Sequence, residues 1–170
     1  ATSGVRFSSA YTECPICVAA RRTFLTGQKP SSHGVFSNYG TELPGKTLPG
    51  VLSQSGYQTH LVGKLHLWPA RKLHGFDSTD WADNARPHPE FDEYDRFLVE
   101  QGVVDHRAGI AHGAPGNGWV ARPYHLDERL HFTNWCADRA IRFLERRDPT
   151  TPYFLNVSFH QPHQPLTPPK

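Results

Sequence analysis

The 170-residue sequence has no methionine, only three cysteines and no apolar run that approaches the length of a transmembrane helix. Without methionine it lacks an initiator residue, and its first residues show no charged segment followed by an apolar one, as a secretory signal would. We therefore expect the natural N-terminus to lie outside these residues. We also expect no membrane partner.

The sequence also has little net charge. Its formal net charge is only +2, and its Lys and Arg residues do not cluster as they do in dedicated nucleic-acid or polyanion binders. Hydrophobic residues make up 37% and charged residues 20%, which is typical of a soluble globular protein. The length suffices for one domain with a core, and no nucleic-acid partner is expected.

The three cysteines are Cys14, Cys17 and Cys136. An odd number, with two of them only three positions apart, is a poor disulfide framework. This pattern favours a reducing compartment or a functional thiol. Cys136 falls within a helical pattern and has no neighbouring ligand pair, so we expect it to be a core residue.

Helical and strand patterns alternate along the chain. Helices are expected at 18–26, 48–55, 92–100 and 127–146, and strands at 57–62 and 153–159. Gly27 and Gly56 stand where helices end. The remaining stretches, 28–46 and most of 69–125, are predicted to be loops. This alternation indicates an α/β domain with a largely parallel sheet.

Basic and imidazole side chains follow both predicted strands. Lys64 and His66 come after the first strand, and His160 and His163 after the second. In open parallel sheets, ligands bind beyond the carboxyl ends of the strands, so these groups predict an anion site. His160 is expected to point away from that site, because three residues along an extended loop commonly change the facing side.

Cys17 immediately precedes a predicted helix, and Arg21 lies one helical turn further on. A helix N-terminus favours bound anions and the thiolate form of cysteine. We therefore expect Cys17 and Arg21 to share a pocket with the side chains that follow the strands. Taken alone, this pair would be better explained as a buried cysteine and a surface arginine.

Three blocks of sequence carry a more specific signal. Segment 17–27, CVAARRTFLTG, resembles the sulfatase signature, in which Cys or Ser, a variable residue, Pro or Ala, a variable residue and Arg precede Leu-Thr-Gly. Segment 56–67, GYQTHLVGKLHL, resembles a second sulfatase block, and segment 158–169, SFHQPHQPLTPP, a third. All three occur in family order, and only the 69–125 loop is unmatched.

The resemblance implies an α/β, alkaline-phosphatase-like (sulfatase) domain, with a mostly parallel sheet flanked by helices, here incomplete. Residues 1–170 would be a partial sulfatase catalytic domain that lacks the N-terminal and C-terminal segments carrying the metal ligands. The family activity is hydrolysis of sulfate esters through a formylglycine, which would derive from Cys17. A divalent metal, usually calcium, would be bound by this formylglycine and by ligands outside the chain.

The same resemblance implies a role for each site residue. The hydrate of the formylglycine at Cys17 attacks sulfur and is later regenerated as the aldehyde. Arg21 would hold and orient this residue, and Lys64 would bind both the hydrate and a sulfate oxygen. His66 would act as the base, and His163 would bind sulfate and help to protonate the leaving oxygen. The implied partners are a small-molecule or carbohydrate sulfate ester and a formylglycine-generating enzyme.

Two departures and several alternatives remain. Ala19 stands where proline is usual and Val18 where a small polar residue is usual, which leaves the maturation enzyme open. Phosphonate monoester and phosphodiester hydrolases share the superfamily and form the alternative class. Cys14-Pro-Ile-Cys17 is also typical of thiol–disulfide oxidoreductases, although there the first cysteine opens the helix. A zinc site would need a second ligand pair, and a non-catalytic fragment is a further alternative.

Overall fold

The computed structural model describes residues 3–39, 42–43, 45–83, 92–103, 113–114 and 117–170. The strands are β1 (Gln58–Gly63), β2 (Ser78–Trp81) and β3 (Tyr153–Ser158). The helices are α1 (Cys17–Thr26), α2 (Pro30–His33), α3 (Leu48–Gln54), α4 (Glu93–Glu100), the 3-10 turn η1 (Glu128–Leu130) and α6 (Phe132–Arg146).

The described strands form a parallel sheet in the order β2-β1-β3. The register pairs Gly63 at the end of β1 with Trp81 of β2 and with Ser158 of β3. All three strands therefore end at the same level. The residues that follow them emerge at one carboxyl edge, so the expectation of parallel neighbours is confirmed.

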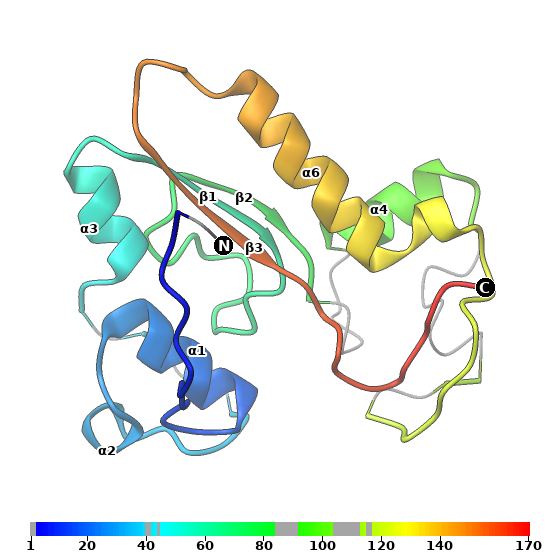
Figure 1. Ribbon diagram of the computed structural model, residues 1–170, viewed down its shortest axis with the longest axis horizontal. Coiled ribbons are helices and arrows are strands. Elements are labelled where there is room, and N and C mark those ends of the chain that lie inside the picture. Colours follow the sequence, from blue (N-terminus) through cyan, green and yellow to red (C-terminus); the bar gives the residue numbers. More distant parts are fainter. Residues whose placement is uncertain (1–2, 40–41, 44, 84–91, 104–112, 115–116) are drawn as a thin grey trace.

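Helices α1, α2 and α3 gather to one side of the strands, and α4 and α6 to the other (Figure 1). Two clusters of buried side chains separate in the same way. One consists of Leu25, Leu43, Leu61, Leu65, Leu67, Ala70, Phe76 and Trp81. The other consists of Val62, Ala82, Tyr94, Leu98, Tyr124, Leu130, Phe132, Trp135, Cys136 and Ala140. The sheet is thus covered on both faces, as parallel sheets require.

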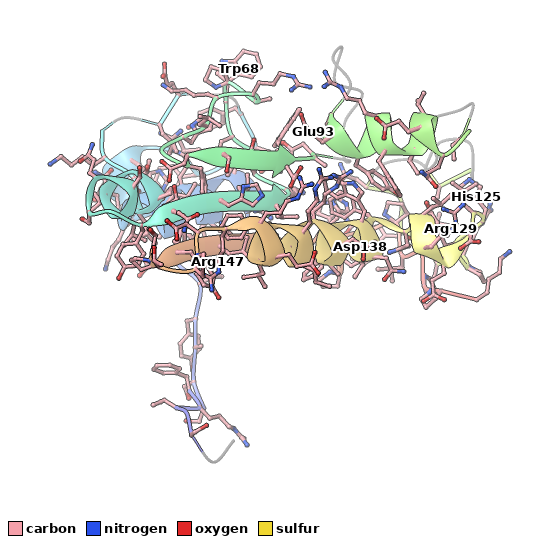
Figure 2. All side chains as sticks on the ribbon, turned by 90° about the horizontal axis from the view of Figure 1, so that it is seen from above. Trp68, Glu93, His125, Arg129, Asp138 and Arg147 are labelled. Carbon is pink, nitrogen blue, oxygen red and sulfur yellow. The ribbon has the colours of Figure 1, made fainter. Side chains whose placement is uncertain are left out.

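Figure 2 shows α6 and the loop that carries Trp68 on opposite sides of the sheet. It also shows the N-terminal segment running away from the rest of the molecule. Val5, Phe7 and Tyr11 in this segment are exposed apolar side chains. Within the described residues, no helix is long and apolar enough to cross a bilayer.

The helix ends follow from local chemistry. Gly27 ends α1 in the left-handed conformation (φ 67°), which glycine adopts without steric cost. Thr47 accepts the Gly50 N–H at the start of α3, and Asp92 forms a capping box with Asp95 at the start of α4. These boundaries agree with the sequence prediction to within a residue or two. The helix expected over 127–146 is divided at His131, whose ring accepts the Thr133 N–H.

Two elements depart from the prediction. The four-residue strand β2 lies within a stretch expected to be irregular, and the single turn α2 lies within the loop expected over 28–46. β2 is polar in its first three positions and has no strand pattern of its own. Pairing with β1 makes it a strand, which is a tertiary effect that local propensity does not contain.

Cys136 is a core residue, as expected. It is completely buried, and burial raises the pKa of its thiol to about 12. A Cβ added at Gly63 would lie 3.0 Å from the Cys136 sulfur, so the helix α6 packs closely on β1 at this point.

Candidate active site

Cys17 is the first residue of α1 and is half-buried. Its Sγ lies 3.2 Å from Nδ1 of His66, which follows β1, and 3.2 Å from Oδ1 of Asn38. Ile16, at the N-cap position, gives no side-chain cap, and the Val18 N–H of the first turn donates to Asn38 Oδ1 instead. The nucleophile candidate is therefore held between an imidazole, an amide and a helix N-terminus.

Arg21 links α1 to both central strands. Its Nη1 donates to the carbonyl oxygen of Lys64 at 2.7 Å and to the Ser158 hydroxyl at 2.8 Å. Lys64 in turn donates its backbone N–H to the Ser158 carbonyl at 2.9 Å. Burial lowers the pKa of Arg21, and the neighbouring charges of Asp83 and Cys17 oppose that shift. The guanidinium is thus fixed by the two strand ends that it joins.

Lys64 comes directly after β1 and is only 2% exposed. Besides burial, the positive charges of Lys64 and Arg21 lower the pKa of His160. Such mutual influence is possible only among groups that lie near one another. The structure therefore brings the residues that follow β1, the residues that follow β3 and Arg21 of α1 into one region.

His160 belongs to this region, and the expectation that it points away is wrong. It is 9% exposed, its ring lies 4.8 Å from that of His163, and it makes an edge contact with Phe132 at 6.2 Å. Burial, followed by the positive charge of Lys64, lowers the pKa of His160 to about 3. The imidazole is therefore neutral at ordinary pH and adds no further charge among these cations.

One ring nitrogen of His163 is already hydrogen-bonded within the protein. Its Nδ1 lies 2.7 Å from the Gln164 carbonyl oxygen, and a carbonyl only accepts, so Nδ1 carries a proton. The Nε2 atom is the one left to meet a ligand. It accepts a hydrogen bond when the ring is neutral and donates one when the ring is charged.

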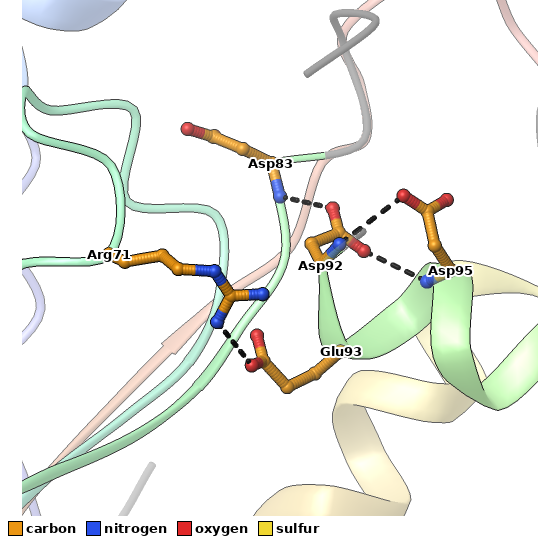
Figure 3. A network of polar contacts seen from close by, with 5 residues as sticks. All are labelled: Arg71, Asp83, Asp92, Glu93 and Asp95. Carbon is orange, nitrogen blue, oxygen red and sulfur yellow. Dashed lines mark hydrogen bonds and ion pairs between the residues drawn. The ribbon is translucent and has the colours of Figure 1, made fainter. Parts of the chain in front are cut away.

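A network of carboxylates supports the loop after β1 from the α4 side. The backbone N–H of His66 donates to Asp83 Oδ2 at 3.1 Å, which holds this non-glycine residue at a φ of 55°. Asp92 accepts the backbone N–H groups of Asp83 and Asp95, both at 2.9 Å (Figure 3). Burial, followed by the charge of Asp95, raises the pKa of Asp92 to about 7.

The donors at this edge do not suit a hard cation. Within the described ranges, no group of three or more His, Cys, Asp or Glu side chains is placed to hold a metal ion. Calcium takes six or more oxygen ligands, whereas Arg21 and Lys64 repel a cation and the imidazoles offer nitrogen atoms rather than oxygen atoms. The residues present therefore do not fit the calcium that the resemblance implies, and they do not form the alternative zinc site.

The arrangement suits a small anion beside a nucleophile. The cationic side chains of Arg21 and Lys64 and the N-terminus of α1 favour a bound negative charge. His66 is close enough to the Cys17 side chain for proton transfer. The oxidoreductase alternative fits less well. Cys14, Cys17 and Cys136 are free thiols, Cys14 is buried, and α1 begins at the second cysteine of the pair rather than at the first.

Sequence reasoning missed three residues at this edge: Asn38, Asp83 and Ser158. Asn38 lies in a stretch expected to be loop, and its contact with Cys17 spans 21 positions. Asp83 follows β2, the strand that was not predicted. Ser158 was seen only as part of the third block. A correct assignment of β2 would have drawn attention to Asp83, whereas no local signal marks Asn38.

The comparisons with known proteins concern the family and the fold of the chain. The sulfatase family model matches residues 1–170. An arylsulfatase of Clostridium perfringens is 36% identical over 190 residues that cover all of this chain and 38% of the relative. The chain therefore spans about two fifths of the length of this relative.

Two solved structures share the fold. The structure of a protein in complex with its substrate, D-glucosamine-2-N,6-O-disulfate, matches with a TM-score of 0.61 and 27% identity over 95% of this chain and 28% of that one. A phosphonate monoester hydrolase of Agrobacterium radiobacter matches with a TM-score of 0.69 and 22% identity over 94% of this chain and 34% of that one. The expected α/β, alkaline-phosphatase-like fold, present as a partial domain, is confirmed.

Proposed function

Because the chain belongs to the sulfatase family, we propose that it forms part of a hydrolase that cleaves sulfate esters with a formylglycine derived from Cys17. The observation that carries the proposal is the position of Cys17 at the start of α1, 3.2 Å from His66 Nδ1 and beside the cations at the carboxyl edge of the sheet. The substrate class is a small-molecule or carbohydrate sulfate ester. The chain also requires a formylglycine-generating enzyme as a partner.

The Cys17 side chain stands in for the hydrated aldehyde, with Sγ in the place of one hydroxyl oxygen. Two polar atoms, on His66 and Asn38, already lie within hydrogen-bond distance of that position, so the surroundings fit a group with two hydroxyls. When formed, the hydrate supplies a hydroxyl nucleophile for sulfur and a route back to the aldehyde that a thiol lacks.

Each charged side chain then has a defined task. Arg21, fixed by Lys64 and Ser158, holds the start of α1 against the strand ends. Lys64 binds a sulfate oxygen and the residue at position 17, and His66 removes a proton there. When its ring is charged, His163 donates from Nε2 to the sulfate ester, and the same proton is passed to the leaving oxygen. Interactions that strengthen as charge develops are worth a few kcal/mol each.

We further propose that residues 1–170 are a partial catalytic domain and that segments outside them carry the metal ligands. The described residues do not fit calcium. Activity is accordingly tested in the full-length protein that carries these residues.

The decisive experiment is peptide mass spectrometry after co-expression with a formylglycine-generating enzyme. The tryptic peptide that contains Cys17 should be about 18 Da lighter than the unmodified peptide, as expected for exchange of a thiol for an aldehyde. A Cys14→Ser variant should still be converted, since Cys14 is buried away from these contacts. Conversion at Cys14, or at neither cysteine with an aerobic or an anaerobic maturase, would contradict the proposal.

Substrate class is tested separately. The converted protein should hydrolyse p-nitrophenyl sulfate with a kcat/KM at least about tenfold above that for the matching phosphodiester or phosphonate monoester, which is about 1.4 kcal/mol of selectivity. The likeness to a phosphonate monoester hydrolase concerns the fold, and a higher kcat/KM for the phosphorus esters would make that alternative class the function.

A further inference from the structure

Asn38 touches the candidate nucleophile, although no motif includes it. Its Oδ1 accepts the backbone N–H of Val18 at 3.2 Å and lies 3.2 Å from the Cys17 sulfur. Asn38 is thereby the residue that caps α1, because Ile16 at the N-cap position gives no side-chain cap. The cap comes from a different segment, 20 positions further along the chain.

The loop that carries Asn38 is tied to α1. Thr23 Oγ1 and His33 Nε2 lie 3.2 Å apart, which joins α2 to α1. The Val35 N–H donates to His33 Nδ1, and the Tyr39 hydroxyl donates to the Gly34 carbonyl at 2.8 Å. These contacts fix the loop on both sides of Asn38, although its surface is exposed.

The orientation of the Asn38 amide follows from its partners. A backbone N–H only donates, so the atom facing Val18 is the amide oxygen. The same oxygen can therefore accept a hydrogen bond only from a donor group on the side chain at position 17. A thiol has a single proton and His66 Nδ1 lies on its other side, whereas a geminal diol has two hydroxyl protons, one for each neighbour.

We propose that Asn38 is a positioning residue for the nucleophile, a role that rests on the proposed function. Its amide oxygen accepts one hydroxyl of the hydrated formylglycine at position 17. This fixes the rotation of the side chain about its Cα–Cβ bond. The second hydroxyl is thereby directed toward His66, which removes its proton.

The contact can be tested without formylglycine, in full-length protein made without a maturase. Alkylation of Cys17 by iodoacetamide is followed by peptide mass in Asn38→Ala, Asn38→Asp and the control Ser37→Ala. In Asn38→Ala the Val18 N–H is freed to stabilise a thiolate, so the rate should rise roughly threefold. In Asn38→Asp the carboxylate keeps the acceptor and disfavours a thiolate, so the rate should fall below that of the wild type. Ser37→Ala should leave it unchanged.

A loosened loop would raise the rate in both Asn38 variants, so opposite shifts identify the contact itself. Rates for Asn38→Ala and Asn38→Asp that move together, or that match the wild type, would overturn the inference. Circular dichroism spectra of the variants that match the wild type show that each has folded.

The positioning role is then tested in converted protein. Asn38→Ala should lower kcat roughly tenfold with KM within about twofold, since the diol is misplaced but sulfate binding is not. Asn38→Asp should recover part of kcat and move the acid limb of the kcat–pH profile up by about one pH unit, because its charge favours protonated His66.

If position 17 is converted and kcat of Asn38→Ala is unchanged, the positioning role is wrong and the proposed function stands. If wild-type Cys17 is never converted, the proposed function fails and the alkylation rates alone decide the contact.

Discussion

The edge of the sheet around Cys17 and the core beneath α4 and α6 are held by different interactions. At the edge, Arg21 is fixed by two directed hydrogen bonds to strand ends. In the core, Tyr94 packs its ring against Phe132 and Trp135, with centroids 5.1 and 5.6 Å apart, and its hydroxyl donates to the Leu130 carbonyl at 2.7 Å. One region depends on a few atoms, and the other on a large buried apolar area.

This difference separates activity from stability. Removing a buried aromatic ring loses many contacts at once and leaves a cavity. Removing one half-buried hydrogen bond changes stability by about 1 kcal/mol but misplaces the groups that it orients. Substitutions in the core should therefore lower the free energy of unfolding, and substitutions at the edge should lower kcat. All are made in the full-length protein that carries these residues.

The largest effect is expected where the two regions meet, at Gly63. A Cβ there would lie 2.3 Å from the Ser158 carbonyl oxygen and 3.0 Å from the Cys136 sulfur, at a φ of 87°. Gly63→Ala should reduce the free energy of unfolding by more than about 4 kcal/mol and abolish activity as well. Urea unfolding of purified protein, or its yield in the soluble fraction, measures this.

Gly56→Ala is the matched control for this substitution. Gly56 has nearly the same φ, 86°, but a Cβ there would meet open space. Gly56→Ala should reduce the free energy of unfolding by only about 1–2 kcal/mol, because only the left-handed backbone conformation opposes the new side chain. Equal losses at the two positions would show that the close approach of β3 and α6 to Gly63 is wrong.

Trp135→Ala should reduce the free energy of unfolding by about 3–5 kcal/mol, because the ring is almost completely buried in the aromatic cluster. Ile141→Ala, on the exposed side of the same helix, should change it by less than about 0.5 kcal/mol. Formylglycine formation at Cys17 should persist in both. Similar midpoints of urea unfolding for the two variants would contradict the assigned core.

Asp92 makes stability depend on pH. Its folded-state pKa is raised to about 7, so the folded protein keeps a proton that the unfolded chain releases near pH 4. Stability contributed by this group is therefore lost as pH rises from about 4 to about 7, on the order of 2–4 kcal/mol. Asp92→Asn should remove that loss, and Asp95→Asn should reduce it. Parallel curves of unfolding free energy against pH for wild type and Asp92→Asn would refute this.

Apart from the controls, the smallest change in stability is expected for Ser158→Ala, which removes the hydrogen bond between the Ser158 hydroxyl and the Arg21 guanidinium. The free energy of unfolding should fall by about 1 kcal/mol. The kcat of converted protein should nevertheless fall several-fold, since Arg21 loses one of its two anchors. Thr150→Ala, at a surface hydroxyl that bonds Asp148, should leave kcat unaltered. A normal kcat in Ser158→Ala would show that the Lys64 carbonyl alone positions Arg21.

Much of the frame was predictable because its signals are local. Gly27, Thr47 and Asp92 mark helix ends through their own backbone or side-chain chemistry. The β-favouring residues of β1 and β3 mark strands, and adjacent parallel strands place their following residues at one edge. These facts, together with the family blocks, predict that Lys64 and His163 share one site.

The rest depended on contacts between distant segments. β2 becomes a strand by pairing with β1, and Asn38 reaches Cys17 across 21 positions. His160 was assigned the wrong direction, because alternation along a loop ignores the burial that Phe132 and His163 provide. Such effects belong to packing, which a single sequence does not display.

The hydrogen bonds of Arg21 to the Lys64 carbonyl and to the Ser158 hydroxyl also depend on how β3 is aligned with β1. If β3 slipped by one residue against β1, Ser158 would be replaced by Val157 or Phe159, and neither side chain accepts a hydrogen bond. Arg21 would then be left partly buried without one of its acceptors, which is costly for a guanidinium. A misaligned sheet would thus leave Arg21 without this hydrogen bond, so Arg21 favours the correct register of β3 against β1.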